Sequence, residues 1–115
     1  MAGGNIVDLR IIEGYSQKPA VIEKVAADAP YDIVFIDGSH DYDDVVADLK
    51  NYGSMVKVGG YLVMDDSSLY VPGAYGRFLG HPDVSRAAAD VMDKDVRFRH
   101  LYAIGHDRVW VRRND

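Results

Sequence analysis

Apolar and polar positions recur with two different periods along the chain, and the two periods separate strands from helices. Residues 31–37 (YDIVFID) form an unbroken apolar run that ends at an aspartate, and residues 59–66 (GGYLVMDD) repeat this arrangement. Such runs predict strands of a parallel sheet that are buried on both faces. Residues 5–14 (NIVDLRIIEG) are rich in β-branched side chains and end at a glycine, which predicts one more strand.

Between these runs, apolar residues recur three or four positions apart, which is the spacing of one face of a helix. Pro19 suits the first turn of the first such segment. Acidic residues open the second segment, where they favour the helix dipole. The predicted helices cover residues 18–29, 42–56 and 81–95.

The C-terminal segment has the pattern of a hairpin. Residues 97–113 alternate, break at Gly105-His106-Asp107 and alternate again, which predicts two antiparallel strands. Strands and helices that take turns along a chain predict parallel strands joined by right-handed crossovers. We therefore expect an α/β fold in a single domain over residues 1–115, with parallel strands, a C-terminal antiparallel hairpin and helices on both faces.

Composition narrows the possible functions. The chain has 115 residues, enough for one modest core, and its net charge of −5 argues against a nucleic-acid partner. No apolar run approaches the roughly 20 residues of a membrane helix, so we expect no membrane partner. The absence of cysteine excludes disulfides, thiolate metal sites and a cysteine nucleophile, and it fits a cytoplasmic protein.

Acidic residues gather where the predicted strands end. Asp37 closes one apolar run, and Asp65 and Asp66 close another. Ligands bind beyond the carboxyl ends of parallel strands, and carboxylates this close repel one another unless a cation lies between them. Oxygen ligands favour a hard ion such as Mg²⁺, Ca²⁺ or Mn²⁺. Alternatively, each aspartate simply caps the turn that follows it.

His40 and the loop of Tyr15, Ser16 and Gln17 belong to the same predicted edge. His40 follows Asp37 by three residues. An imidazole with an ordinary pKa of about 6.5 suits proton abstraction at the rim of a metal site. The alternative is an exposed histidine without a catalytic role.

Four stretches taken in order resemble a known family: IIEGYSQ, YDIVFIDGSH, VKVGGYLVMDDSSLYVPGA and RHLYAIGHDRVWVR. They resemble the class I S-adenosylmethionine-dependent O-methyltransferases, in particular the metal-dependent branch with catechol O-methyltransferase and enzymes of antibiotic biosynthesis. The resemblance implies a Rossmann-like sheet. It also implies a divalent cation such as Mg²⁺ on Asp37, Asp65 and Asp66, and His40 as the general base.

The resemblance further implies that Ser16 and Gln17, with Tyr15 and Asp37 beside them, contact the cofactor S-adenosylmethionine. The implied reaction methylates a small hydroxylated substrate. A cation lowers the pKa of the substrate hydroxyl, His40 removes the proton, and the oxygen attacks the sulfonium methyl in line.

One departure from the family pattern limits this expectation. The family's glycine-rich loop and its ribose-binding acid come earlier in the fold than any segment of this sequence. The chain therefore resembles the C-terminal half of a methyltransferase, as a fragment or a half-domain. We expect it to bind little S-adenosylmethionine and to be inactive alone. The alternative function is a non-catalytic binding or assembly module derived from a methyltransferase.

Two other classes fit less well. A phosphoacceptor receiver domain would have its acid pair on the first strand and a lysine on the last, and a serine hydrolase would need a G-x-S-x-G elbow. The apolar strand at 31–37 needs a neighbour on each side. We expect either a missing N-terminal half or a homodimer, with the strand at 5–14 moving in beside residues 31–37.

Overall fold

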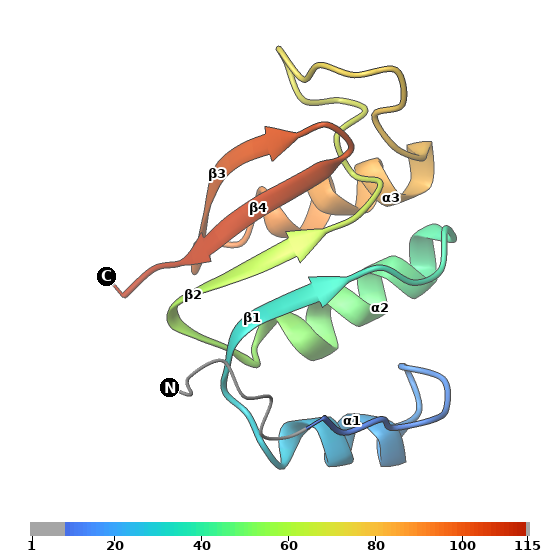
Figure 1. Ribbon diagram of the computed structural model, residues 1–115, viewed down its shortest axis with the longest axis vertical. Helices are drawn as coiled ribbons and strands as arrows, with labels where there is room; N and C mark the ends of the chain where they lie inside the picture. The colour runs from blue at the N-terminus through green and yellow to red at the C-terminus, as the bar shows by residue number, and fades with distance from the viewer. Residues whose placement is uncertain (1–8, 115) are drawn as a thin grey trace, which may run out of the picture.

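The computed structural model describes residues 9–114, which form a four-stranded sheet with its helices packed along it (Figure 1). The strands are β1 (Tyr31–Ile36), β2 (Val56–Met64), β3 (Phe98–Ile104) and β4 (Asp107–Arg112). The helices are α1 (Pro19–Ala26), α2 (Tyr42–Gly53) and α3 (Pro82–Ala87), and α3 continues into a π-helical turn at Ala88–Met92. No helix in this part of the chain is long and apolar enough to cross a membrane.

The order of strands across the sheet is β1-β2-β4-β3. β1 and β2 are parallel, in a register that pairs Ile33 with Tyr61 and Ile36 with Met64, and α2 connects them. β4 runs antiparallel to both β2 and β3. The predicted α/β class, the parallel pair and the C-terminal hairpin are therefore confirmed.

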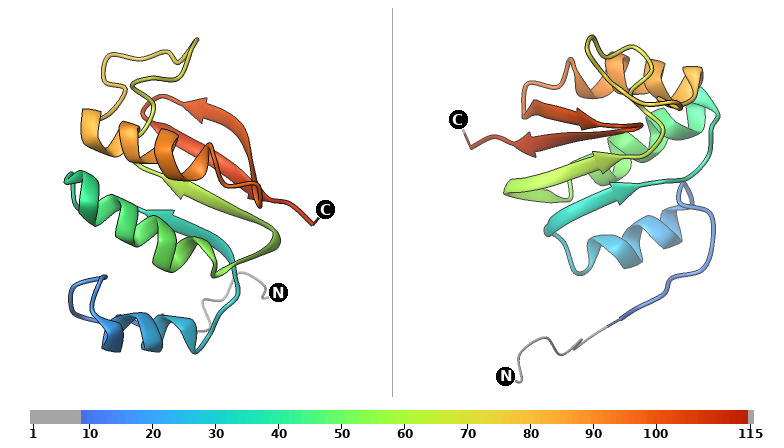
Figure 2. Two further views of the ribbon diagram at one scale, coloured as in Figure 1. Left: turned by 180° about the vertical axis from the view of Figure 1, so that it is seen from behind. Right: turned by 45° about the horizontal axis from the view of Figure 1, so that its top comes forward.

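The core lies between the sheet and the helices α2 and α3. Trp110, Leu62 and Met64 are completely buried, and they contact residues of both helices. Figure 2 shows that the helices lie on the same face of the sheet. The expectation of helices on both faces is therefore wrong for residues 9–114, and the other face of the sheet is open.

The open face also corrects the prediction that the strand at 31–37 is buried on both faces. Ile33 is 62% exposed and Phe35 is 54% exposed, because β1 is an edge strand and no helix covers their side of the sheet. Residues 9–14 contain no strand, so the prediction for 5–14 and its movement beside β1 are wrong there; residues 5–8 lie outside the described part.

Helix α1 touches the rest of the fold only lightly. It has no buried residue, and a hydrogen bond from the Tyr31 hydroxyl to the Val25 carbonyl ties it to the start of β1. An ion pair of 2.6 Å joins Arg10 to Asp28 just after the helix. The segment before β1 is thus held by a few polar contacts, whereas α2 and α3 are held by the apolar core.

A buried arginine joins the hairpin to the end of the helical layer. Arg108 on β4 is 5% exposed, and its guanidinium lies 2.7 Å from the Asp93 carboxylate. The same carboxylate accepts a hydrogen bond from the Trp110 indole. Arg108 also donates to the ring of His100, and burial together with this positive charge lowers the pKa of His100. His100 is thus a structural histidine with its own partner.

Truncation of neighbouring residues on β1 and β2 tests which face is the core. Leu62→Ala should lower the free energy of unfolding by about 2–5 kcal/mol, because it leaves a cavity. Ile33→Ala, one strand away on the open face, should change it by less than about 0.5 kcal/mol in the monomer, at concentrations too low for self-association. Chemical denaturation of both variants gives the comparison. If Ile33→Ala lowered the free energy of unfolding as much as Leu62→Ala does, the open face would be covered in solution.

Candidate functional site

The carboxylates predicted from the sequence meet at one edge of the sheet. The ladder between β1 and β2 continues past both strands, because the Asp65 amide donates to the Ile36 carbonyl at 3.0 Å. This bond brings Asp37 and Asp65, the residues that follow the two strands, side by side. Asp66 comes next and is 13% exposed at its side chain.

The Asp65 carboxyl group raises the pKa of Asp37 above its ordinary value, chiefly through a side-chain hydrogen bond between the two groups. Burial, followed by a hydrogen bond with Asp107, raises the pKa of Asp65. A hydrogen bond between two carboxyl groups needs a proton, because two ionised carboxylates repel each other. Two carboxyl groups in this position favour a proton or a cation between them, so the chemistry of the pair suits a cation.

The backbone at Asp66 is held in an unusual conformation. Asp66 has a φ of 59°, in the left-handed region that side chains other than glycine rarely adopt. Its carbonyl accepts a hydrogen bond from the His81 amide at 3.0 Å. Gly80 passes so close that a Cβ there would lie 2.2 Å from this carbonyl oxygen. The end of β2 and the start of α3 are thus locked together.

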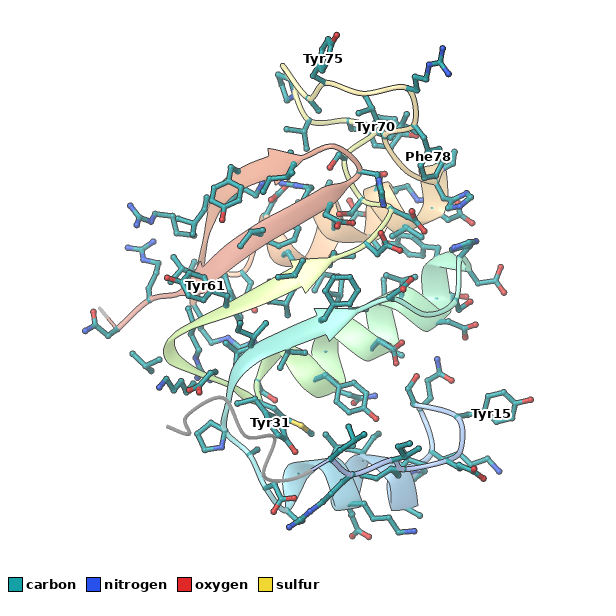
Figure 3. The ribbon with its side chains drawn as sticks, viewed as in Figure 1. Tyr15, Tyr31, Tyr61, Tyr70, Tyr75 and Phe78 are labelled. Atoms are coloured by element: carbon teal, nitrogen blue, oxygen red, sulfur yellow. The ribbon has the colours of Figure 1, made fainter. Side chains whose placement is uncertain are left out.

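Histidines surround these carboxylates. Nε2 of His40 lies 3.2 Å from Oδ2 of Asp66, and Nε2 of His106 lies 2.9 Å from Oδ1 of Asp65. His81 stacks on His40 with ring centroids 3.8 Å apart. Phe78 lies edge-on to His81, and Figure 3 shows it beside the start of α3. The structure thus places His40 beside Asp66.

Two of these histidines were missed from the sequence. His81 precedes Pro82 and looks like the start of a helix, while His106 looks like part of a hairpin turn. The sheet order contained a signal for His106, because the turn of a hairpin beside β2 lies at the same edge as the end of β2. His81 had no comparable signal.

The loop predicted to contact a cofactor is fixed to helix α2. The Ser16 hydroxyl donates to Oδ1 of Asp48, and the Tyr52 hydroxyl donates to the Ser16 carbonyl, both at 2.6 Å. Asp48 is 6% exposed, and burial raises its pKa although the Ser16 hydrogen bond acts in the opposite direction. The sequence analysis also missed Asp48 and Tyr52, because the spacing of residues in a helix does not predict which loop its polar side chains contact.

A pocket of about 330 Å³ joins this loop to the carboxylates. Ser16, Asp37 and Asp48 line it together with apolar side chains such as Val25 and Phe35. Tyr15 is not part of it: this side chain is 75% exposed and projects away from the sheet in Figure 3. Gln17 is half-buried outside the pocket lining. The structure thus brings Ser16 and Asp37 together, but not Tyr15.

Comparison with known proteins gives a family and a set of similar folds. A family model described as a methyltransferase domain matches residues 5–67. Two solved structures of MycE methyltransferase from the mycinamycin biosynthetic pathway align with TM-scores of 0.61 and 0.62. They are 22% and 21% identical to this chain and cover 89% and 90% of it. One is a complex with Mg and SAH, the other with Mg, SAH and mycinamycin VI.

A third structure, the O-methyltransferase NovP, aligns over 81% of this chain with 22% identity and a TM-score of 0.54. Among curated proteins, an uncharacterized protein of Acanthamoeba polyphaga mimivirus is 49% identical over 39 residues, which are 34% of this chain and 18% of that protein. The chain spans 31–35% of the length of these three structures. At this identity the structures show a shared fold.

The crowded carboxylates predict a stability gain from removing one charge. Asp37→Asn should raise the melting temperature by a few degrees near pH 7 without metal. When the pKa of a carboxyl group is higher in the folded state than in the unfolded state, its ionised form destabilises the fold at pH values above the folded-state pKa. This destabilisation is lost as the pH falls and the carboxyl group takes up a proton. The difference in melting temperature between Asp37→Asn and the unsubstituted protein should therefore shrink towards about pH 4.

Thermal unfolding across this pH range measures the effect, with Asp32→Asn as the control. Asp32 lies on β1, the strand that Asp37 follows, but it pairs with Lys57, so its replacement should not stabilise the fold. A lower melting temperature for Asp37→Asn at neutral pH would contradict the proposed crowding.

Proposed function

This chain belongs to the methyltransferase-domain family, and from this premise we propose that it carries the metal- and base-bearing part of an O-methyltransferase. The enzyme would use S-adenosylmethionine and a divalent cation such as Mg²⁺ to methylate a small hydroxylated compound. The observation that supports this most is the meeting of Asp37, Asp65, Asp66 and His40 at one sheet edge.

The oxygen donors of these residues suit a divalent cation, and those of Asp65 and Asp66 already lie within 4.8 Å of each other. Asp37, Asp65 and Asp66 would hold it through oxygen atoms, which Mg²⁺ prefers. A cation between them would relieve the interaction with Asp65 that raises the pKa of Asp37. Support also comes from the similar fold of MycE, which was solved with Mg and SAH. When bound, such a cation lowers the pKa of a nearby hydroxyl group.

His40 would accept the proton of the substrate hydroxyl at Nδ1, because Nε2 faces the Asp66 carboxylate and donates to it. Its side chain is 54% exposed, so a substrate can reach the ring. The Asp66 carboxylate at 3.2 Å orients the ring and stabilises the imidazolium that forms when the proton arrives. The stacked ring of His81 limits how far His40 can turn. S-adenosylmethionine would supply the methyl group.

The cofactor would lie along the pocket that Ser16 and Asp37 share. Ser16 is already positioned by Asp48 and Tyr52, which favours a fixed contact with the cofactor base. Gln17 would complete this contact, and Tyr15 could reach it only after turning inward from its exposed position. We infer that another segment or chain supplies the rest of the cofactor cradle, since residues 9–114 hold no glycine-rich turn between a strand and a helix.

The open side of β1 favours a partner. Ile33 and Phe35 place apolar surface beside an unpaired strand edge, which invites pairing with a further strand. The partner would be either a second copy of this chain or the missing N-terminal half of the methyltransferase fold. The same surface favours the alternative function, a non-catalytic assembly module, if metal binding fails.

A titration with Mg²⁺ tests the metal site. The original chain should show a thermal shift and binding heat with Mg²⁺, and Asp65→Ala should lose both because one oxygen ligand is gone. Asp32→Ala serves as the control, since Asp32 is exposed at the other end of β1. Equal responses from Asp65→Ala and the original chain would rule out this site.

Light scattering at micromolar concentration tests the partner. We expect a two-fold dimer whose population rises with concentration, because the apolar face of β1 becomes covered. Replacing Ile33 and Phe35 together by serine should shift the protein to monomer and leave the Mg²⁺ response intact. A monomer at every concentration would exclude the homodimer and favour the N-terminal half as the partner.

A further inference from the structure

Two imidazole nitrogens converge on a single carboxylate oxygen at this edge. Nε2 of His40 lies 3.2 Å from Oδ2 of Asp66, and Nε2 of His81 lies 3.9 Å from the same atom. At 3.9 Å, His81 makes no hydrogen bond to the carboxylate. The stacked rings, with planes 28° apart, present the same ring atom to Asp66. Three separate segments thus bring two nitrogens and one oxygen together.

The spacing of these atoms fits metal coordination. A metal bonded to nitrogen and oxygen at about 2.1 Å in a tetrahedral arrangement separates its ligand atoms by about 3.4 Å. The two distances to Asp66 lie on either side of this value, and all three ligand atoms lie within 4.8 Å of one another. His81 would need to approach Asp66 by about 0.5 Å and to tilt away from its stack on His40, because an imidazole nitrogen binds a metal near the plane of its ring. Its side chain is 39% exposed, which leaves room for this shift.

The backbone around the three residues is already fixed. The His81 amide is bonded to the Asp66 carbonyl, and only glycine fits at position 80 between them. On the other side, the Ser39 hydroxyl accepts from the Asp41 amide and donates to Asp44, which fixes the turn that carries His40. Ligands held in this way bind a metal with little loss of conformational freedom.

We propose that His40, Asp66 and His81 bind a borderline transition-metal ion, with Zn²⁺ as the reference case. Imidazole nitrogen favours Zn²⁺, Co²⁺ and Ni²⁺ over Mg²⁺, whereas the oxygen-only set of Asp37, Asp65 and Asp66 favours the hard ion. Two histidines and one carboxylate also leave a fourth position open for water or a substrate atom. The two ligand sets share Asp66, so their occupancies are mutually dependent.

This inference rests on the proposed function in one respect, the role of His40. A zinc ion on Nε2 would leave the proton of the ring on Nδ1, so that His40 could no longer accept the proton of the substrate. Zinc would therefore oppose methyl transfer while Mg²⁺ supports it, and the relative supply of the two ions would regulate the site.

Calorimetric titration of the full chain with zinc chloride, and separately with magnesium chloride, tests the site. His81→Phe keeps an aromatic ring against His40 and removes the nitrogen ligand. We expect it to weaken zinc binding at least about tenfold and to leave the Mg²⁺ response unchanged. Asp66→Asn should weaken the binding of both ions, and Asp37→Asn should weaken only that of Mg²⁺.

His106→Phe is the matched control. The ligand atoms of His106, Asp65 and Asp66 also lie within 4.8 Å of one another, so this histidine is the obvious competitor for zinc. Its replacement should leave zinc affinity unchanged. Zinc binding that depends on His106 and not on His81, or on neither, would overturn the proposal.

Nuclear magnetic resonance of the histidine ring nitrogens in the original chain gives a test that needs no variant to fold. Zinc should shift the resonances of His40 and His81, and those of the half-buried His100 should stay in place. Unmoved His81 resonances at saturating zinc would refute the site. If zinc fails in this way while Asp65 still governs the Mg²⁺ response, the proposed function stands and this inference falls. Zinc binding without any Mg²⁺ response would support this inference and contradict the proposed Mg²⁺ site.

Discussion

The crowding of negative charge beyond β1 and β2 is the constraint on which the rest of the site depends. One backbone hydrogen bond, from the Asp65 amide to the Ile36 carbonyl, extends the parallel ladder past the strands and forces Asp37 against Asp65. The apolar core fixes this ladder, because Met64 directly before the acids is completely buried. The carboxylates cannot separate without disturbing that packing, so protons, imidazoles or a cation must balance their charge.

The sequence predicted those features that depend on the local pattern of side chains. The two apolar runs and the alternating hairpin placed every strand found between residues 31 and 114. The exposure of Ile33 and Phe35 could not be predicted, because burial of an apolar strand depends on what covers it. An apolar run predicts that a cover exists in the functional protein; it does not say whether that cover belongs to the same chain.

Some residues of the candidate site could also be predicted from the local sequence, and others could not. Asp37, Asp65 and Asp66 were found because the ends of parallel strands share one edge, and His40 because it lies close to Asp37 in sequence. The bonds of Ser16 to Asp48 and of Tyr52 to Ser16 join residues 32 and 36 positions apart. His106 and Asp65 are likewise distant in sequence. Such contacts depend on how segments dock, and no spacing rule in a single sequence predicts them.

The two parts of the site differ in how firmly they are held. Asp65, Asp66 and His81 adjoin β2 and α3, whose inner faces form the core. The Ser16 loop is attached through two side-chain hydrogen bonds to α2, and the helix that follows it has no buried residue. The metal side is therefore preorganised within this chain, while the cofactor side can adjust when the open edge of β1 is covered. A covering partner would thus act mainly on the pocket beside Ser16, and the carboxylate edge would keep its geometry.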